Sequence, residues 1–440
     1  MEYIPNILFL LLLAAAVGLF SRNIRRMVRN VKIGRKKELN DNKARRWRNM
    51  ARIALGQSKM VVRPVAGLMH ILVYLGFIII NIEILEIVID GILGTHRIFA
   101  PLGAVYDLLI GLFEILALLV IIAVVVFWIR RNVLRLGRFI KPEMKGWPKK
   151  DADLILYIEL ILMLLFLTMN GADFQLQKMD VVPYVEAGWF PVSQMFSVLF
   201  ADMSAGSLVL IERGAWWLHI IGVLCFLNYL YYSKHLHIIL AFPNTYYGRL
   251  DPKGQLDNLE SVTNEVKLMM DPTADPYATP ANDIVPEKFG ASDVMDLKWI
   301  QLLNAYTCTE CGRCTSECPA NQTGKMLSPR KIMMDTRDRL EEVGRNMTKN
   351  NGAFQDDGKQ LLDDYITREE LWACTSCNAC VEACPISIDP LSIIMDMRRY
   401  LVMEQSAAPQ ELNVMMTNIE NNGAPWPFNQ MDRANWADEM

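Results

Sequence analysis

Five apolar stretches constrain what this chain of 440 residues can fold into more than any other feature. A helix needs about 20 mostly apolar residues to cross a bilayer. The first stretch follows Glu2 rather than a basic leader and has no clear cleavage site, so we expect a retained helix rather than a signal peptide. Residues 173–214 are also apolar in part, but Asp202 and Glu212 interrupt them, and we interpret them as an interfacial segment. The sequence therefore predicts five transmembrane helices, at residues 3–20, 64–88, 102–129, 153–171 and 215–241.

Basic residues are concentrated in alternate loops between these stretches. Residues 21–60 contain fourteen Lys and Arg, and residues 130–152 contain eight. The positive-inside rule places such loops in the cytoplasm, so the N-terminus is expected in the periplasm and the C-terminal half in the cytoplasm. The net charge is only −3 and the basic run lies between two spans, so nucleic acid is not an expected partner. We expect a multi-pass protein of a bacterial inner membrane.

Four of the five histidines fall in the predicted spans, where imidazole is uncommon and usually has a partner. His70 lies in the second span, and His219, His235 and His237 lie in the fifth. Eighteen residues are five helical turns, so His219 and His237 would share one helix face, roughly 27 Å apart. His235 is rotated roughly 160° from His219. Because the second span runs outward and the fifth inward, His70 and His237 would be level near the cytoplasmic side.

This placement predicts that His70 and His237 are the axial ligands of a haem b. The alternative is that each histidine only hydrogen bonds to a neighbouring helix. A second haem at His219 would need another ligand, and Ile80, about three turns beyond His70, cannot ligate iron.

Four acidic residues also fall in or near the predicted spans: Glu83, Glu86, Glu114 and Glu159. An ionised carboxylate is costly in hydrocarbon, so we expect these groups to be protonated, paired or in contact with water. Proton delivery to a quinone and hydrogen bonding between helices are both open interpretations.

Two copies of one cysteine pattern lie in the C-terminal half, "CTECGRCTSECP" at 308–319 and "CTSCNACVEACP" at 374–385. Each reads C-x2-C-x2-C-x3-C-P, the bacterial ferredoxin run for 4Fe–4S clusters, in which the fourth cysteine ligates the other cluster. Zinc is the alternative, but this spacing suits a tetrahedral zinc site poorly. We therefore expect two clusters, one held by Cys308, Cys311, Cys314 and Cys384, the other by Cys374, Cys377, Cys380 and Cys318.

The repeat extends beyond the cysteines, because "SPRKIMMDTRDRL" at 328–340 aligns with "DPLSIIMDMRRYL" at 389–401. Ser328 and Asp389 are N-cap residues, and each is followed by proline at the first helical position. Thr367 and Glu370 form a capping box before the second run. We predict an all-α protein: a five-helix membrane bundle joined to a cytoplasmic helical ferredoxin domain whose two halves pack around a pseudo-two-fold axis.

We divide the chain into four parts. Residues 1–241 form the membrane domain. Residues 242–290, which contain six prolines, form a linker with one short helix near 258–270. Residues 291–403 form the dicluster domain, and residues 404–440 form a tail that either wraps the domain or docks a partner.

The membrane half resembles the cytochrome b subunit of respiratory nitrate reductase, with histidine in span two and two histidines five turns apart in span five. The resemblance implies that His70 and His237 share the cytoplasmic haem. The family's second histidine of span two falls at Ile80. That departure puts an outer haem, and the quinol site beside it, in doubt.

The cytoplasmic half resembles the helical ferredoxin domain of heterodisulfide reductases and of fused electron-transfer flavoprotein:menaquinone oxidoreductases. The phrases "CTECGRCTSECPA", "GKMLSPRKI" and "ELWACTSCNACVEACPI" carry this resemblance. The fused proteins usually continue into cysteine-rich CCG domains. Because this sequence has no CCG pair, the resemblance implies a separate iron–sulfur partner subunit.

We expect a membrane-bound oxidoreductase subunit that passes electrons between a cytoplasmic donor, two 4Fe–4S clusters, haem b and the menaquinone pool. The donor is expected to be an electron-transfer flavoprotein or a CCG-type partner. Two alternatives stay open: a haem-free membrane anchor for a ferredoxin, and an ion-translocating redox module. The scatter of Glu86 and Glu114 over different spans argues against the second alternative.

Overall fold

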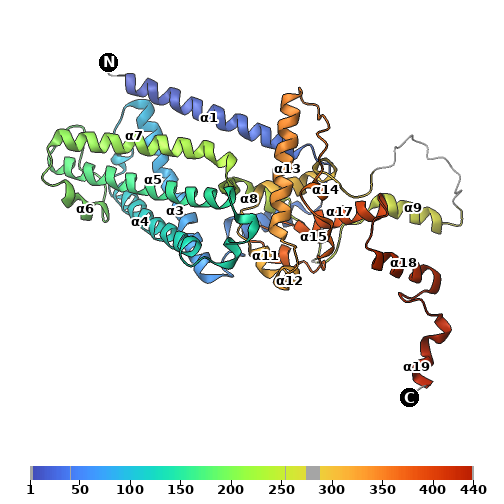
Figure 1. Cartoon of the computed structure of the whole chain (residues 1–440). Helices are drawn as coiled ribbons and strands as arrows, with labels where there is room; N and C mark the ends of the chain where they lie inside the picture. The colour runs from blue at the N-terminus through green and yellow to red at the C-terminus, as the bar shows by residue number, and fades with distance from the viewer. Residues whose placement is uncertain (1–2, 40, 253, 274–287, 439–440) are drawn as a thin grey trace.

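The computed structural model describes residues 3–39, 41–252, 254–273 and 288–438. Five long helices lie side by side and form a bundle. A group of shorter helices packs against one end of this bundle (Figure 1). The described residues contain helices and two isolated bridges but no strand. The predicted all-α architecture is therefore confirmed.

The five long helices are apolar and long enough to cross a membrane, as the sequence predicts. Proline at the first turn favours the start of three of them, where its missing N–H costs nothing. Gly94 ends the second in the left-handed conformation, with φ of 76°, which an L side chain rarely adopts. Their bounds are α1 Ile4–Val31, α3 Pro64–Leu93, α4 Ala104–Asn132, α5 Trp147–Lys178 and α7 Ala205–Tyr229.

Helix α3 contacts α4, α4 contacts α5, and α5 contacts α7. Helix α1 completes the bundle, because it packs against both α3 and α7. The interior is filled by buried apolar side chains, among them Phe9, Ile110, Phe113, Phe166 and Ile220. Many leucine and isoleucine side chains face outward, as at Leu11 and Leu68. That composition matches helices surrounded by lipid rather than water.

The bounds of the five helices differ from those of the predicted spans, and the largest shifts at one end are in α1 and α7. Helix α1 continues to Val31, so the basic residues from Arg22 to Arg29 lie on a helix and not in a loop. Helix α7 begins at Ala205, ten residues earlier than predicted. Glu212 is tolerated inside it because Tyr184 Oη donates to the carboxylate at 2.8 Å and Arg213 pairs with it.

The fifth span also ends earlier than predicted, and this corrects the placement of two histidines. The α7 helix tightens into a 3₁₀ turn up to Tyr232, and Ser233 is extended, with φ −113° and ψ 148°. A second 3₁₀ turn, Lys234–Leu236, leads into α8, His237–Tyr246. His235 and His237 therefore lie beyond the span. The argument that His219 and His237 share one helix face is wrong, because no continuous helix joins them.

Asp151 of α5 provides a physical reason for this break. Its carboxylate accepts hydrogen bonds from Tyr229 Oη and, at 3.2 Å, from the backbone N–H of Lys234. The Ser233 hydroxyl accepts from the backbone N–H of His235 at 3.1 Å. Side chains thus satisfy the backbone donors that a break exposes.

The dicluster domain consists of short helices joined by the cysteine loops. As predicted, Ser328 and Asp389 cap the helices that follow the two loops, and Thr367 and Glu370 form a capping box. The helices are α10 Trp299–Thr307, α11 Arg313–Glu317, α12 Pro319–Gln322, α13 Pro329–Lys349, α14 Leu361–Asp364, α15 Arg368–Trp372, α16 Ala379–Ala383 and α17 Pro390–Met403.

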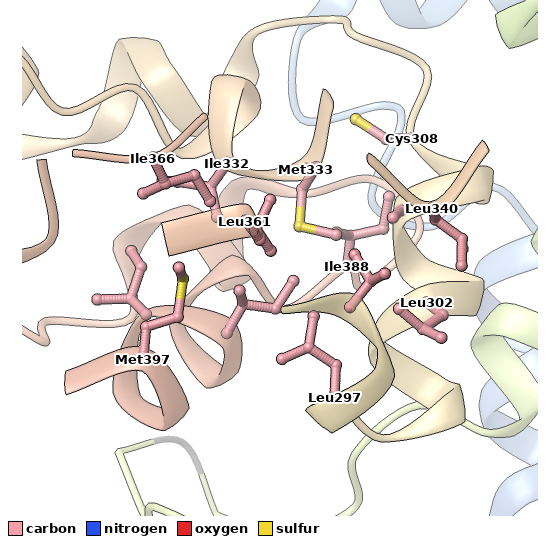
Figure 2. Close-up of a cluster of buried hydrophobic side chains, with 14 of the residues drawn as sticks. Leu297, Leu302, Cys308, Ile332, Met333, Leu340, Leu361, Ile366, Ile388 and Met397 are labelled. Carbon is pink, nitrogen blue, oxygen red and sulfur yellow. The ribbon is translucent and has the colours of Figure 1, made fainter. Parts of the chain in front are cut away.

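Each helix of the first repeat packs against its counterpart in the second, since α11 contacts α16 and α13 contacts α17. Leu302, Ile332, Met333 and Ile388 fill the space between them, and Cys308 lies at one end of this cluster (Figure 2). The two cysteine loops are thereby brought together.

The bundle and the dicluster domain share one hydrophobic core. Met27 of α1, Leu230, and Leu240 of α8 belong to the same buried cluster as Leu302 and Ile332. The predicted linker therefore begins after α8, because that helix packs against α10. Asn30 Nδ2 adds a buried hydrogen bond to Tyr306 Oη at 2.9 Å.

The remaining helices are peripheral. The predicted linker helix is present as α9, Glu260–Met270, whereas linker residues 253 and 274–287 lie outside the described residues. In the tail, α18 Gln410–Asn422 and α19 Asn435–Asp438 have no buried residues and extend away from the domain (Figure 1). The tail therefore does not wrap the dicluster domain. The short helices α2 Lys43–Met50 and α6 Ser193–Phe196 lie in loops between spans.

Candidate functional site

The two cysteine loops have the same backbone conformation. Glu310 and Ser376, at equivalent positions, have φ of 55° and 57°. Gly312 and Asn378, two residues later, are left-handed, with φ of 70° and 60°, and each precedes a short helix. Glycine and asparagine are the residues that adopt this conformation most readily. The repeated sequence therefore builds two equivalent loops.

A cavity beside the first loop brings together the four cysteines predicted to share a cluster. Cys308, Cys311 and Cys314 line it from the first loop, and Cys384 reaches it from the second. Its other lining residues are Thr309, Gly312, Arg330, Met333, Cys380, Ile386, Ile388 and Pro390. The fourth cysteine of one run thus faces the first three of the other.

Electrostatic contacts between thiols show the complementary arrangement at the second loop. Burial, and then the neighbouring Cys374 and Cys318 among other groups, raises the pKa of the Cys380 thiol. Burial also raises the pKa of Cys384, to about 11, and Cys311 adds to this shift. Cys318 therefore lies with the second run and Cys384 with the first.

The donor set fits iron–sulfur clusters better than single ions. Across the described parts of the chain, no three His, Cys, Asp or Glu side chains converge closely enough to hold one metal ion. Tetrahedral zinc would require four donors about 2.0–2.3 Å from a common centre. Eight largely sheltered thiols, with five of them lining one apolar cavity, suit a larger metal–sulfur group.

Three histidines meet where the bundle joins the dicluster domain. The ring centroids of His70 and His237 are 6.5 Å apart, and those of His235 and His237 are 5.5 Å apart. Two imidazoles that ligate one metal from opposite sides, each at about 2 Å, have centroids roughly 6 Å apart. The spacing of His70 and His237 is close to this value.

The three imidazole rings have different hydrogen-bond partners. His237 Nδ1 lies 3.0 Å from the carbonyl oxygen of Lys234, a bond that fixes the ring and leaves Nε2 free to act as a ligand. His70 Nδ1 is buried without a hydrogen-bond partner. His235 Nε2 lies 3.6 Å from Glu159 Oε1, so this ring has a carboxylate neighbour instead. His70 and His237 are thus better placed than His235 to hold a planar group between them.

His219 lies apart from this group. It is buried in α7, its Nδ1 is 3.0 Å from the carbonyl oxygen of Leu162, and its ring faces Phe166 at 6.3 Å. Ile80, the position opposite in the predicted arrangement, is a buried apolar side chain. These contacts match a histidine that hydrogen bonds to the neighbouring helix.

Arg313 connects the histidines with the first cysteine loop, and no pattern in the sequence indicated this role. Its guanidinium is close enough to His70 and to Cys311 to interact electrostatically with both. It also donates to the carbonyl oxygens of Lys59 at 2.9 Å and Met60 at 3.2 Å, just before α3. The cavity of the first loop is therefore next to the histidine group.

A second connection is a buried network of ion pairs. Lys234, whose carbonyl holds His237, pairs through its ammonium with Glu310 in the first cysteine loop. Glu310 also pairs with Arg337 at 2.9 Å. Burial alone would raise the pKa of Glu310, but Lys234 and Arg337 bring it below its usual value. The position of Glu310 inside the cysteine run was the only sequence signal for this network.

Comparisons with known proteins agree with the assignment of the cysteine loops to iron–sulfur clusters. Residues 307–388 match the family model of the 4Fe–4S dicluster domain. The chain is 30% identical to FadF of Bacillus subtilis, named a probable iron–sulfur-binding oxidoreductase, over 98% of this chain and 61% of the relative. It is 27% identical to the EtfAB:quinone oxidoreductase of Syntrophomonas wolfei, over 91% of this chain and 55% of the relative.

Another relative matches a shorter part of the chain. This relative is one subunit of the ferredoxin/F420H2-dependent CoB–CoM heterodisulfide reductase of Methanosarcina acetivorans, 31% identical over 27% of this chain and 60% of its own length. No solved structure matches. The chain spans between one half and two thirds of the length of the first two relatives. The chain is thus similar to iron–sulfur oxidoreductases over most of its length, and it combines a 4Fe–4S dicluster domain with five helices that are long and apolar enough to cross a membrane.

Proposed function

We propose that this chain passes electrons between a soluble donor and menaquinone, through two 4Fe–4S clusters and one haem b. The observation that carries the proposal is the meeting of the His70 and His237 rings, 6.5 Å apart, beside the cavity of the first cysteine loop. Arg313 interacts electrostatically with both groups. When bound, the clusters and the haem would supply one-electron redox chemistry.

The positions of the cysteines give the order of the two clusters along the proposed electron path. Cys308, Cys311, Cys314 and Cys384 would hold the cluster nearer the membrane, because their cavity adjoins the histidine group. The other four cysteines, Cys374, Cys377, Cys380 and Cys318, would hold the outer cluster. Cys377 is exposed in the second loop, so this loop is the side on which a donor can approach. An electron-transfer flavoprotein is the proposed donor, by analogy with the relative named EtfAB:quinone oxidoreductase.

The proposed orientation follows the basic residues. Residues 21–60 and 130–152, which hold twenty-two of the Lys and Arg, include segments that contact the dicluster domain through Arg29 and Arg138. The positive-inside rule then places the dicluster domain in the cytoplasm and the far end of the bundle outside. We propose a bacterial inner membrane as the location.

The test is a visible spectrum of the detergent-purified full chain, oxidised and then reduced with dithionite, with haem and iron assayed per chain. We expect a b-type absorbance band, one haem and about eight non-haem irons. His70→Ala should lose the haem and keep the non-haem iron. Leu68→Ala is the matched control, because Leu68 is on the same helix turn but its side chain is 56% exposed. Loss of the reduced haem band on adding a menaquinone analogue would support the final transfer.

Eight irons without haem would contradict the haem assignment and leave a membrane-anchored ferredoxin. Two haems per chain would contradict the single-haem arrangement and point to His219 as a further ligand. Haem retained in His70→Ala would exclude this residue as a ligand.

A further inference from the structure

A buried group of charged side chains occupies the end of the bundle that lies away from the dicluster domain. The structure gathers it from three helices and a loop, although the sequence scatters its members. Each member is at most 9% exposed. We call it the distal acid cluster, and its members are Glu83, Glu86 and Asp90 of α3, Arg97 of the following loop, Glu114 of α4 and Asp173 of α5.

Arg97 is the only cation among these six residues, and it donates hydrogen bonds to one carboxylate of the cluster and to a neighbouring tyrosine. Its Nε donates to Asp173 Oδ2 at 2.6 Å, and its Nη1 donates to Tyr106 Oη at 3.0 Å. Tyr106 Oη in turn donates to Glu86 at 3.0 Å, and the backbone N–H of Phe99 donates to the same carboxylate at 3.0 Å. Asp173 and Glu86 therefore each have hydrogen-bond donors.

Backbone N–H groups serve two further carboxylates. Asp90 accepts from the backbone N–H groups of Arg97 at 2.8 Å and Ile98 at 3.2 Å. Glu114 accepts from those of Val192 at 2.8 Å and Ser193 at 3.0 Å, and from an asparagine side chain of α5. These two carboxyl groups therefore also have hydrogen-bond donors.

Glu83 is different from the other four carboxyl groups. It is 4% exposed, and its Oε2 is buried without a hydrogen-bond partner. Arg97 and the carboxyl groups of Glu86 and Glu114 are all within electrostatic reach of it. One guanidinium cannot balance five carboxylates, and an ionised carboxylate without a donor is very costly in this environment. Glu83 is therefore the member in which a bound proton replaces the missing partner.

His96 lies beside the distal acid cluster and is slightly exposed. Its side chain is 11% exposed, its Nε2 lies 3.8 Å from Asp173 Oδ2, and its Nδ1 has no hydrogen-bond partner. The ring also stacks edge-on against Tyr184 at 4.8 Å. Histidine with one free nitrogen and one carboxylate neighbour can accept and pass on a proton.

We propose that the distal acid cluster is a proton-exchange site in which Glu83 binds one proton and exchanges it with the aqueous phase at this end of the bundle through Asp173 and His96. The step is a proton transfer between a carboxylic acid and water, so no oxidant or reductant is needed. The site would serve any reaction in the membrane half that takes up or releases protons together with electrons. The inference goes beyond the proposed electron transfer and does not depend on the haem.

The experiment is infrared spectroscopy of the full chain in lipid nanodiscs at neutral pH, with exchange from H₂O to D₂O. We expect a carboxylic acid C=O band that shifts on exchange and is lost in Glu83→Gln. Glu186→Gln is the matched control, because Glu186 is an exposed carboxylate at the same end of the bundle, and it should retain the band. His96→Leu should slow the shift by about tenfold or more, as loss of a proton-transferring group does.

An unchanged band in Glu83→Gln would overturn the proposal, because Glu83 would then be ionised. A band that is lost in Glu83→Gln but does not shift in D₂O would also overturn the proposal. The proton on Glu83 would then not exchange with water, and its role would be structural. If Glu83→Gln loses its iron and does not fold, Glu83→Asp should keep an exchanging band at a changed position, and its absence would count against the proposal. None of these outcomes depends on haem or quinone, so the proposed function succeeds or fails separately.

Discussion

The contact between Glu143 and Arg330 joins the dicluster domain to the membrane bundle. The stability that the protein loses when this contact is removed can be predicted. Glu143 lies in the loop between α4 and α5, and Arg330 is at the start of α13. Arg330 Nη2 donates to Glu143 Oε1 at 2.7 Å, and the Ser328 hydroxyl donates to the same oxygen at 2.7 Å. The Arg330 side chain is fully buried, and its Nε already has no hydrogen-bond partner.

Two substitutions should give graded effects. Glu143→Ala leaves a buried guanidinium without its carboxylate, a change that costs about 3–5 kcal/mol of stability. Glu143→Gln keeps an acceptor oxygen and loses only the charge, which should cost about 1–2 kcal/mol, the difference between charged and neutral hydrogen bonds. The alanine variant should therefore lose more stability than the glutamine variant, by about 1 kcal/mol or more.

The assay is urea denaturation of the full chain in detergent, followed by the visible absorbance of the dicluster domain. Glu186→Ala, an exposed carboxylate at the far end of the bundle, is the control and should match the unsubstituted chain. If both Glu143 variants fall within about 0.5 kcal/mol of the control, as ordinary surface changes do, the pair contributes nothing and the reasoning is refuted.

The same ion pair predicts a pH dependence. Burial alone would raise the pKa of Glu143, but the hydrogen bonds from Arg330 and Ser328 and the Arg330 charge hold it below its usual value. A carboxyl with a lowered folded-state pKa contributes its full stability above the unfolded value of about 4.3 and loses it as the pH falls through the folded value. The stability difference between the unsubstituted chain and Glu143→Gln should therefore shrink below pH of about 4. A difference that is constant with pH would contradict this.

Three further predictions concern the dicluster domain. Cys384→Ser and Cys318→Ser should each lower the iron content from about eight to about four per chain, with the loss from a different cluster in each, as electron paramagnetic resonance can distinguish. Arg339→Met, which removes a fully buried partner of Asp293, should cost about 3–5 kcal/mol in urea denaturation. Thr367→Ala should cost about 1 kcal/mol in the same assay, because the capping hydrogen bond before the second cysteine loop is lost.

Features encoded by neighbouring residues could be predicted from the sequence. The five spans follow from continuous apolar runs, and the helix starts after Ser328 and Asp389 follow from an N-cap and a proline. The helical character of the dicluster domain follows from the same signals. Each depends on contacts within a few positions of the chain, so one local pattern is sufficient.

Features set by distant residues could not be predicted in this way. The break after Tyr232 depends on Asp151, about eighty positions earlier, whose carboxylate satisfies the exposed N–H of Lys234. Helical periodicity extended through this break and gave His237 the wrong element. The convergence of Glu86 and Glu114 also depends on how α3 packs against α4. The positions of Glu86 and Glu114 in the sequence therefore did not indicate that they belong to one cluster.

Helix α3 carries residues of both proposed sites, His70 near its start and Glu83 in its second half. Thirteen residues of helix separate them, a rise of roughly 20 Å. Substitutions this far apart that share no partner are expected to have independent effects. His70→Ala should therefore leave the exchanging carboxylic acid band intact, and Glu83→Gln should leave the haem content intact. A variant at either site that removed both signals would mean that the bundle had lost its packing, and neither site could be inferred from it. Separate losses would support two independent sites on one helix, one that holds haem and one that exchanges a proton.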